Sequence, residues 1–501
     1  MSRKPNILFV MTDQQRFDSI AALGNSDIYT PNLDRLVARG VSFLNAYSPC
    51  PVCVAARYVV RTGCLPPTTR VFSNSISKPA LGQDDSIVGR CGNYIAQEMA
   101  SREYRTFGIG KFHTQPWDEN LGYQSYLRSE ELYANPDQRQ NDDFAQFIAE
   151  VHPEYKFIEA LMGERTEMYY MPQMSALPEE CTVESWVADR AVERIRFSDN
   201  KPFFGFVSFI GPHPPFAPPV PFNRMYDPDR MPSPVRGDIN TDHMDEQIRW
   251  MNHAIWADDI SDSHARVLRA RYYGELSFID KCLGRIIDAV EDRQDSENTL
   301  ICFFSDHGDH MGDHSAWQKE SFFDVSCRVP FLLSWPREIP QGVISEAFVG
   351  LEDLFGVATN ASGNTDCREG DDILSVINGG CVGRENYLGI YGQPGTSLFK
   401  CMIRSRDWKY IFMANGGLEQ LFNISEDPNE IDDLSKSKIQ LVKEMRDIAV
   451  SLLKNSVGAE DAIESNDLRV FDSSSRPLER IYQFDRSRGI NNFPRYPSDC
   501  L

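Results

Sequence analysis

The stretch Asn6–Gln14 (N-I-L-F-V-M-T-D-Q) decides the fold class. Its apolar part, Asn6–Met11, predicts a buried strand that stops where polar residues begin. A helix should follow, because Thr30 is a suitable N-cap, Pro31 is a suitable first helical residue, and Gly40 closes the apolar stripe after them. Strand and helix together form one βα unit.

The same alternation of short apolar runs and helix-period segments continues to about residue 370 and predicts an α/β fold with a mostly parallel sheet sandwiched by helices. The further strands are expected at Thr106–Gly110, Phe203–Ile210, Leu300–Ser305 and Phe331–Trp335, and the helices at Val88–Ala100, Val183–Phe197 and Arg266–Val290. Two polar or proline-rich stretches, Asn120–Met174 and Pro212–Pro221, are interpreted as long loops or insertions.

The texture changes from about Gly380, where short strand-like pieces at Phe399–Arg404 and Trp408–Phe412 precede an amphipathic stretch at Ser435–Leu453. We therefore predict two domains, a catalytic α/β domain at residues 1–375 and a smaller C-terminal α+β domain with a short antiparallel sheet at residues 376–501.

Composition limits the possible partners. The 501 residues carry a net charge of −22, and 41% are hydrophobic. An acidic chain is a poor ligand for nucleic acid or an anionic membrane surface, and no segment approaches the roughly 20 apolar residues that span a bilayer. We expect a soluble protein whose anionic substrates are attracted by local cations.

The cellular compartment is inferred from the N-terminus and the cysteines. The run Ile7–Met11 is shorter than the apolar region of a secretory signal, which predicts a cytoplasmic protein, although a periplasmic protein without its signal would look similar. The twelve cysteines are scattered, which favours reduced thiols over a disulfide framework.

Polar residues follow the predicted strands, where an open α/β sheet binds its ligands. Taken singly, an Asp can cap a helix, a His can be structural and a Lys can be a solvated charge. Cys50 and Cys53 could form a redox or zinc pair, but a zinc ribbon needs a second such pair and none exists. Together the segments supply oxygen ligands for a cation, cations for an anion and one candidate nucleophile: Asp13, Gln14, Cys53, Arg57, Lys111, His113, His213, Asp306 and His307.

The order of these segments resembles the sulfatase family of the alkaline-phosphatase superfamily. The matching stretches are Asn6–Gln14, Thr30–Gly40, Cys53–Gly63 (C-V-A-A-R-Y-V-V-R-T-G), Gly110–His113 (G-K-F-H) and Ser305–Lys319 (S-D-H-G-D-H-M-G-D-H-S-A-W-Q-K), and the tail Arg404–Leu434 also resembles the family's C-terminal sheet. The resemblance implies an alkaline-phosphatase-like fold and hydrolysis of a small anionic sulfate ester.

The resemblance further implies that a formylglycine-generating maturation enzyme oxidises Cys53 to formylglycine. That enzyme reads Cys-x-Pro-x-Arg or Cys-x-Ala-x-Arg, and Ala55 stands here in place of the commoner proline. A hydrated aldehyde has two hydroxyls on one carbon, so one can attack sulfur and the other can expel sulfate by elimination.

By the same resemblance, a divalent metal, Ca²⁺ in the family, is held by Asp13, Gln14, Asp306 and His307 together with the modified Cys53. Gln14 and His307 stand where many relatives have Asp and Asn. Fewer carboxylates and a nitrogen donor weaken the preference for Ca²⁺, so Mg²⁺ and Mn²⁺ stay open, as does an outer position for His307.

The remaining roles also follow from the resemblance. Arg57 supports the nucleophile, and Lys111 and Lys319 neutralise sulfate oxygens in the transition state. His113 is the expected base for the elimination, and either His213 or Lys319 protonates the departing alcohol. His310 and His314 also belong to the stretch Ser305–Lys319. We expect His310 to be a substrate-side or surface residue, and His314 to lie near the site or to have a structural role.

Two rival functions remain. A phosphonate monoester or phosphodiester hydrolase of the same superfamily shares the modified cysteine and a stretch like His213–Phe216, whereas the pair Lys111 and His113 argues for sulfate. A non-catalytic protein that binds sulfated glycans would keep Cys53 as a thiol. The long loops favour a sulfated sugar over an aryl sulfate, and the sequence does not specify the oligomeric state.

Overall fold

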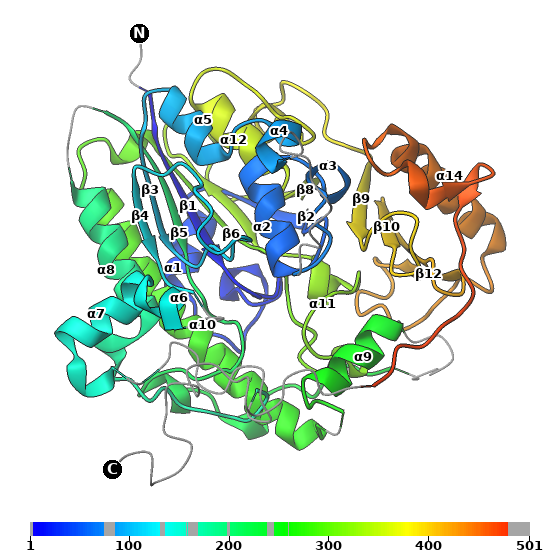
Figure 1. Cartoon of the computed structure of the whole chain (residues 1–501), viewed down its shortest axis with the longest axis horizontal. Helices are drawn as coiled ribbons and strands as arrows, with labels where there is room; N and C mark the ends of the chain where they lie inside the picture. Colours follow the sequence, from blue (N-terminus) through cyan, green and yellow to red (C-terminus); the bar gives the residue numbers. More distant parts are fainter. Residues whose placement is uncertain are drawn as a thin grey trace.

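The computed structural model describes residues 4–74, 86–130, 136–156, 158, 169–197, 201–237, 245–258 and 260–478. A large α/β body carries a smaller sheet, which lies at the right of Figure 1. Within these ranges, no helix has both the length and the apolar composition needed to cross a bilayer.

The body is built on an eight-stranded sheet in the order β4-β3-β5-β1-β6-β7-β2-β8. All neighbouring strands are parallel except where β7 pairs with β6 and β2. The predicted mostly parallel sheet is confirmed. Its strands are β1 (Asn6–Thr12), β2 (Val41–Tyr47), β3 (Arg105–Gly110), β4 (Ser125–Arg128), β5 (Phe203–Ser208), β6 (Thr299–Ser305), β7 (Phe331–Ser334) and β8 (Val343–Gly350).

β1 lies in the middle of this sheet and is buried on both faces. Ile7, Phe9 and Met11 enter one hydrophobic cluster, and Leu8 and Val10 enter the other. Because successive side chains of a strand point to opposite faces, a strand covered on both sides is a continuous apolar run. This explains why the first strand of the sequence shows no alternation.

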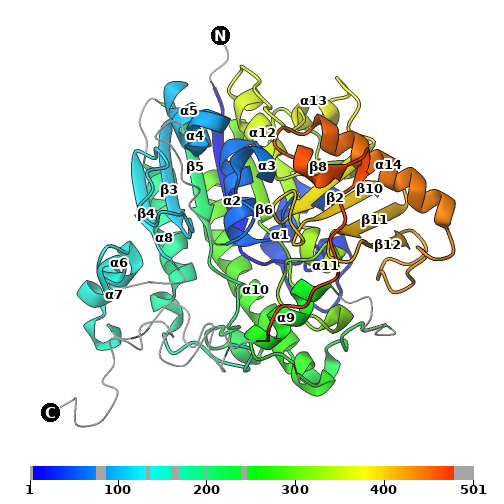
Figure 2. The same cartoon turned by 45° about the vertical axis from the view of Figure 1, so that its right-hand side comes forward.

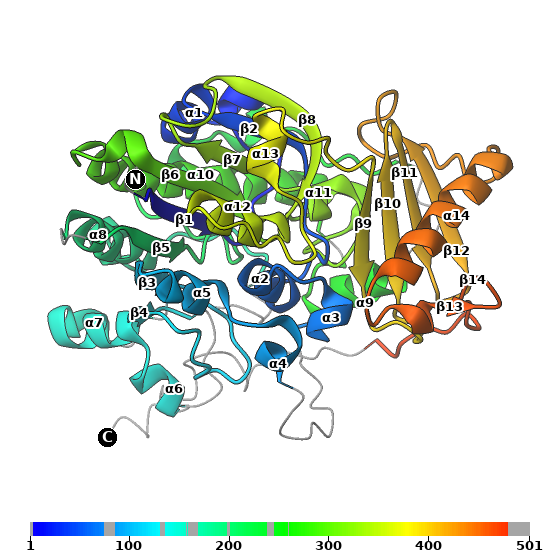
Figure 3. The same ribbon diagram turned by 90° about the horizontal axis from the view of Figure 1, so that it is seen from above.

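Helices cover the two faces of the sheet, as Figure 3 shows from above. One layer contains α1 (Pro31–Ala38), α7 (Asp143–Val151), α8 (Val183–Arg196) and α10 (Asp262–Glu291), and the other contains α2 (Cys53–Thr62), α5 (Ile95–Ser101) and α12 (Asp353–Ala361). The remaining helices of the body are α3 (Pro66–Thr69), α4 (Ile87–Cys91), α6 (Pro136–Gln140), α9 (Glu246–Ala254), α11 (Asp324–Cys327) and α13 (Ile373–Ile377).

The C-terminal region forms an antiparallel sheet in the order β12-β11-β10-β9, as predicted. Along β10, Cys401 and Ile403 face the core under α14, while Met402 faces the body, so the sheet lies between the two (Figure 2). The boundary predicted after residue 375 stays a prediction, since α13 spans it. The elements are β9 (Asn386–Tyr391), β10 (Lys400–Ser405), β11 (Trp408–Met413), β12 (Leu418–Asn423), α14 (Ile439–Asn455), β13 (Ile463–Glu464) and β14 (Asp467–Leu468).

Two predicted segments have a different structure. The helix expected at Val88–Ala100 is two helices, α4 and α5, because Gly92 adopts a left-handed φ of 80° between them. The stretch Asn120–Met174 is not all loop, since it contains the edge strand β4 and the helix α7. β4 was missed because three of its four side chains are only partly buried and it carries no apolar run.

Thr30 stands at the predicted N-cap position, but its side chain does not cap the helix. Thr30 precedes α1 without a capping hydrogen bond from its side chain. Instead, the carboxylate of Asp280 on α10 accepts the backbone N–H groups of Asn32 (3.1 Å) and Leu33 (2.7 Å). The unpaired donors of the helix start are thus satisfied by a neighbouring helix rather than by the local cap.

Candidate active site

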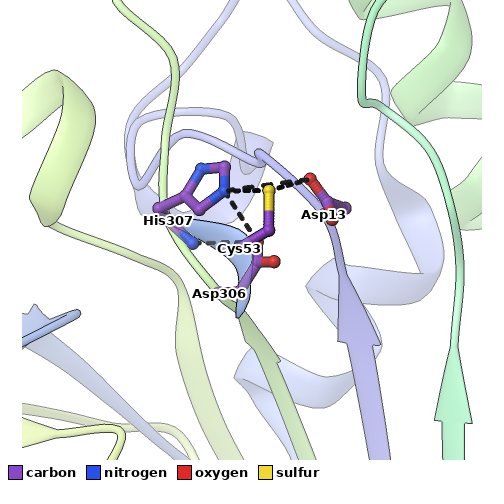
Figure 4. Close-up of side chains that lie close together, drawn as sticks. All are labelled: Asp13, Cys53, Asp306 and His307. Carbon is purple, nitrogen blue, oxygen red and sulfur yellow. Dashed lines mark hydrogen bonds and ion pairs between the residues drawn. The ribbon is translucent and has the colours of Figure 1, made fainter. Parts of the chain in front are cut away.

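Cys53 lies in the first turn of α2, beside the residues that follow β1 and β6 (Figure 4). Ligand atoms of Asp13, Cys53, Asp306 and His307 all lie within 4.8 Å of one another, and all four side chains are buried. The Cys53 Sγ is 3.1 Å from the His307 Nε2 and 3.9 Å from an Asp13 oxygen. Residues from three distant parts of the chain therefore meet around one sulfur atom.

Arg57 is the cation under this cluster. It follows Cys53 by one helical turn, so the two side chains share a face of α2. Its guanidinium donates to Asp13 (2.8 Å) and Asp306 (3.0 Å). It also donates to the Lys111 carbonyl and the Ser208 hydroxyl. Arg57 thereby connects the ends of β1, β3, β5 and β6 to the helix that carries the cysteine.

Lys111 supplies a second cation, with its Nζ 2.6 Å from Asp13 Oδ2, the same oxygen that accepts from Arg57. The chain reaches this position through Gly110, whose φ is 102°. A Cβ on Gly110 would lie 1.9 Å from the Ser208 carbonyl oxygen, so only glycine fits between β3 and β5 here. The glycine lets Lys111 turn in beside Asp13.

Burial and neighbouring charges set the protonation of the cluster. Burial opposes ionisation of Asp13, but Lys111 and Arg57 hold its pKa well below the usual range. Burial and the charge of Asp13 raise the pKa of Asp306 to about 7, and the same two causes raise the pKa of the Cys53 thiol to about 12. The unmodified cysteine is thus a neutral thiol and not a thiolate nucleophile.

The donor set fits a divalent cation. The His307 Nδ1 lies 2.9 Å from the Gly308 carbonyl, which only accepts, so this nitrogen carries the proton and Nε2 offers its lone pair to the cluster. Burial and Lys319 lower the pKa of His307 well below its ordinary value and keep the ring neutral. Two carboxylates and one neutral imidazole around a single point are typical metal ligands.

Gln14 and Lys319 adjoin the cluster on the side of the loop after β6. The Gln14 N–H donates to Asp306 (3.1 Å), and the Lys319 Nζ donates to the Gln14 Oε1 (2.7 Å). Gln14 has a left-handed φ of 69°, which is unusual for a residue with a side chain. This backbone turn directs the amide toward the loop.

The predicted histidines occupy different positions. His213 follows β5, is buried, and is close enough to Asp13 for its charge to lower the pKa of that carboxyl. His113 is half-buried two residues beyond Lys111, and its backbone N–H donates to Glu130. The placement of its ring as a base stays a prediction. His310 is not a surface residue, since it is fully buried between the Asp313 carbonyl and the Ser321 hydroxyl.

His314 lies apart from the cysteine cluster, half-buried, with its ring stacked on Phe323 at 3.8 Å. It lines a cavity of about 260 Å³ beside the C-terminal sheet, together with Lys400 and Phe422. Of the two expectations for His314, packing against Phe323 fits the structural one.

Several residues of the site were not anticipated. Glu130 accepts the backbone N–H groups of Phe112 and His113, and Ser208 contacts Arg57. The Asp309 carboxylate accepts a hydrogen bond from the Gln14 side-chain amide. Asp309 could have been suspected, because it falls within the same Asp-rich loop as Asp306, whereas Glu130 lies in a stretch interpreted as loop.

Comparisons with known proteins identify the family of this chain. The model of the family described as Sulfatase matches residues 5–361. The chain is 29% identical over 451 residues to an arylsulfatase of Clostridium perfringens, covering 87% of this chain and 91% of that protein. It is 26% identical over 495 residues to the multifunctional alkaline phosphatase superfamily protein PehA of Trinickia caryophylli, covering 87% and 92%.

The fold resembles the crystal structure of a phosphonate monoester hydrolase of Agrobacterium radiobacter, with a TM-score of 0.75, 24% identity, and coverage of 90% of this chain and 96% of that chain. This likeness concerns the fold alone. Since the family model covers most of the sequence, this chain belongs to the sulfatase family and is a sulfuric ester hydrolase.

Proposed function

We propose that this protein hydrolyses a sulfate monoester through a formylglycine made from Cys53, with a divalent metal held by Asp13, Gln14, Asp306 and His307. The observation that carries the proposal is the position of Cys53. Its sulfur lies among two carboxylates and an imidazole nitrogen; Arg57 pairs with both carboxylates and Lys111 pairs with Asp13.

Each cation has a distinct task in this proposal. A bound metal ion supplies Lewis-acid polarisation of the substrate oxygens. Arg57 donates to both carboxylates and so holds residue 53 beside the ends of the strands. Lys111 and Lys319 place two ammonium groups in a water-poor site, where they stabilise the charge that builds on the sulfate oxygens.

Proton transfers are assigned to the histidines and Lys319. His113 takes the proton in the elimination that releases sulfate, and His213 or Lys319 protonates the departing alcohol. Lys319 is tied to Gln14, whereas the His213 Nδ1 is 2.7 Å from the Pro214 carbonyl, which leaves Nε2 as the nitrogen for proton transfer. A pH profile of His213→Gln against that of Lys319→Ala, measured with activated and poor leaving groups, distinguishes the two donors.

The metal is tested by removal and return. Ca²⁺ is the ion implied by the family resemblance, while the His307 nitrogen favours Mn²⁺ over Ca²⁺. Chelation should abolish hydrolysis and lower the melting temperature, and titration with Ca²⁺, Mg²⁺ or Mn²⁺ should restore both. A chelated protein with full activity would contradict the metal site.

The modification is tested by peptide mass. Expression with a formylglycine-generating enzyme should give a Cys53 peptide lighter by about 18 Da than the thiol form. Activity should rise in proportion to that fraction. If Cys53 stays a thiol after this co-expression, a protein that only binds sulfated glycans becomes the better description.

The substrate class is proposed to be a sulfated sugar or an aryl sulfate. A panel of sulfated mono- and disaccharides beside a chromogenic aryl sulfate, ranked by kcat/KM, identifies the leaving group. The second candidate, phosphonate monoester or phosphodiester hydrolysis, is favoured by the stretch His213–Phe216. Sulfate and phosphonate esters of the same alcohol separate these functions.

A further inference from the structure

Asp309 is a fully buried carboxylate on the loop after β6 that none of the roles above uses. One oxygen accepts from the Gln14 Nε2 and from the Tyr170 hydroxyl (3.3 Å), and the other accepts from the Met311 N–H (2.8 Å). All three neighbours are donors. An ionised carboxylate is the side chain that can accept from all of them at once.

The Gln14 amide is held between two groups of opposite character. Its Nε2 donates to Asp309, and its Oε1 accepts from the Lys319 ammonium at 2.7 Å. An ammonium only donates and an ionised carboxylate only accepts, so one orientation of the amide satisfies both. The flipped amide would set N–H against N–H and oxygen against oxygen in a buried site, where unpaired polar groups are costly.

The backbone of Gln14 is also fixed. Its N–H donates to Asp306, and its carbonyl accepts the Tyr272 hydroxyl at 2.9 Å. The side chain therefore has little freedom except the choice between the two amide orientations. That choice matters for a metal site, because an amide oxygen can ligate a cation and an amide N–H group cannot.

We propose that Asp309 is a positioning residue that locks the Gln14 amide with its oxygen toward Lys319 and the metal cluster. The inference rests on the metal site of the proposed function. Asp309 makes no contact with substrate in this proposal. The ability of the Gln14 amide oxygen to bind the metal depends on Asp309, which lies outside the cluster. Partners that orient a metal ligand commonly contribute about 10- to 100-fold to metal affinity.

The test is a two-residue cycle read by metal binding without substrate. Chelator-treated wild type, Asp309→Asn, Gln14→Glu and the double variant are titrated with Mn²⁺ at pH 8 by calorimetry. Asp309→Asn should weaken Mn²⁺ binding, raising Kd about 10- to 100-fold. In either orientation of the new amide, its NH₂ group faces a donor, the Gln14 Nε2 or the Met311 N–H. Gln14→Glu alone should also weaken Kd, because two carboxylates then face each other.

The double variant should bind Mn²⁺ at least about tenfold tighter than either single variant, because the new amide at position 309 can donate to the new carboxylate at position 14. A purely structural role of Asp309 would not be rescued by a change at residue 14. Tyr170→Phe is the matched control: it removes another donor to the same oxygen, keeps the ring, and should change Kd less than about threefold. Melting curves of the metal-free proteins establish that each variant is folded.

Three results would overturn the inference and leave the proposed function intact. Asp309→Asn could bind Mn²⁺ like the wild type, or the double variant could bind no better than the single ones. Alternatively, Gln14→Glu could tighten binding in the wild-type background, as a count of carboxylates alone would predict; this result decides even if Asp309→Asn does not fold. A wild type that binds neither Mn²⁺ nor Ca²⁺ would overturn the proposed function as well.

Discussion

Asp306 and Asp313 lie on the same loop after β6, and both side chains are buried, yet their pKa values move in opposite directions. Burial and the charge of Asp13 raise the pKa of Asp306 to about 7. At Asp313 burial is outweighed by Arg16 and Arg269, which lower the pKa to about 2. In one cluster two carboxylates share the guanidinium of Arg57, and in the other two guanidiniums share one carboxylate.

The contrast teaches which cluster is electrostatically complete. Asp313 accepts from Arg16 at 2.8 Å, from Arg269 at 2.7 Å and from the Val235 N–H at 2.8 Å, so its charge is balanced within the fold. Asp306 faces a like charge at the point where the thiol and imidazole also converge. The cluster around Asp313 holds the loop in place, and the cluster around Asp306 is suited to a cation and an anionic substrate.

The largest effect should come from the nucleophile in the cluster of Asp306. Cys53→Ala should lower kcat/KM for a sulfate ester by at least about 10³-fold, because the reaction then has no covalent route. The control is Cys50→Ala, which removes another buried thiol and should retain activity. Equal losses in the two variants would favour a functional cysteine pair and contradict the proposal.

Lys319 should give the next largest effect. Lys319→Ala should reduce kcat by about 10²- to 10³-fold with a smaller change in KM, since its charge acts where negative charge develops. Lys319→Arg should keep part of the rate. If the alanine variant changed KM alone, Lys319 would be a binding residue without a role in the transition state.

Asp313 should affect stability rather than catalysis. Asp313→Asn leaves two buried guanidiniums without their shared carboxylate and should cost about 3–5 kcal/mol of the free energy of unfolding. The rate per folded molecule should stay within about fivefold of the wild type, because no reacting group is changed. Urea unfolding and kcat measured on the same samples check both statements. A large loss of kcat in folded protein would contradict a purely structural role of Asp313.

The smallest effect is the acid sensitivity of the same carboxylate. Because the folded pKa of Asp313 is about 2 and its unfolded pKa is near 4, the stabilisation is complete above pH 4 and is lost as the pH falls toward 2. The wild type should lose about 2 kcal/mol more than Asp313→Asn over this interval. Parallel pH dependences of the two proteins would contradict the pairing with Arg16 and Arg269.

The sequence predicted the parts of the fold and site that local patterns determine. Polar residues directly after apolar runs identified Asp13, Lys111 and Asp306, since parallel strands end at one edge. It did not predict β8, whose first residues are exposed, or the contribution of Asp280 to the start of α1. Such features depend on which elements become neighbours, and no local pattern specifies that.

Partners within the site were harder to predict than the site itself. The resemblance to sulfatases assigned Arg57 to the nucleophile, but its contacts with four strand ends follow only from the assembled sheet. The opposite charge states of Asp306 and Asp313 likewise depend on residues far away in the sequence. Residue type and spacing indicated the chemistry, while the balance of charges required the fold.

The burial of Cys53 has a consequence for biosynthesis. Its side chain is 0% exposed in the assembled protein, beside the residues that follow β6 and β1. If Cys53 is converted as the proposed function requires, the maturation enzyme must reach the chain around the thiol, which is possible only before these segments close over α2. Activity would then be decided by the order of two events, oxidation and folding, and a chain that folds first would stay an inert thiol protein.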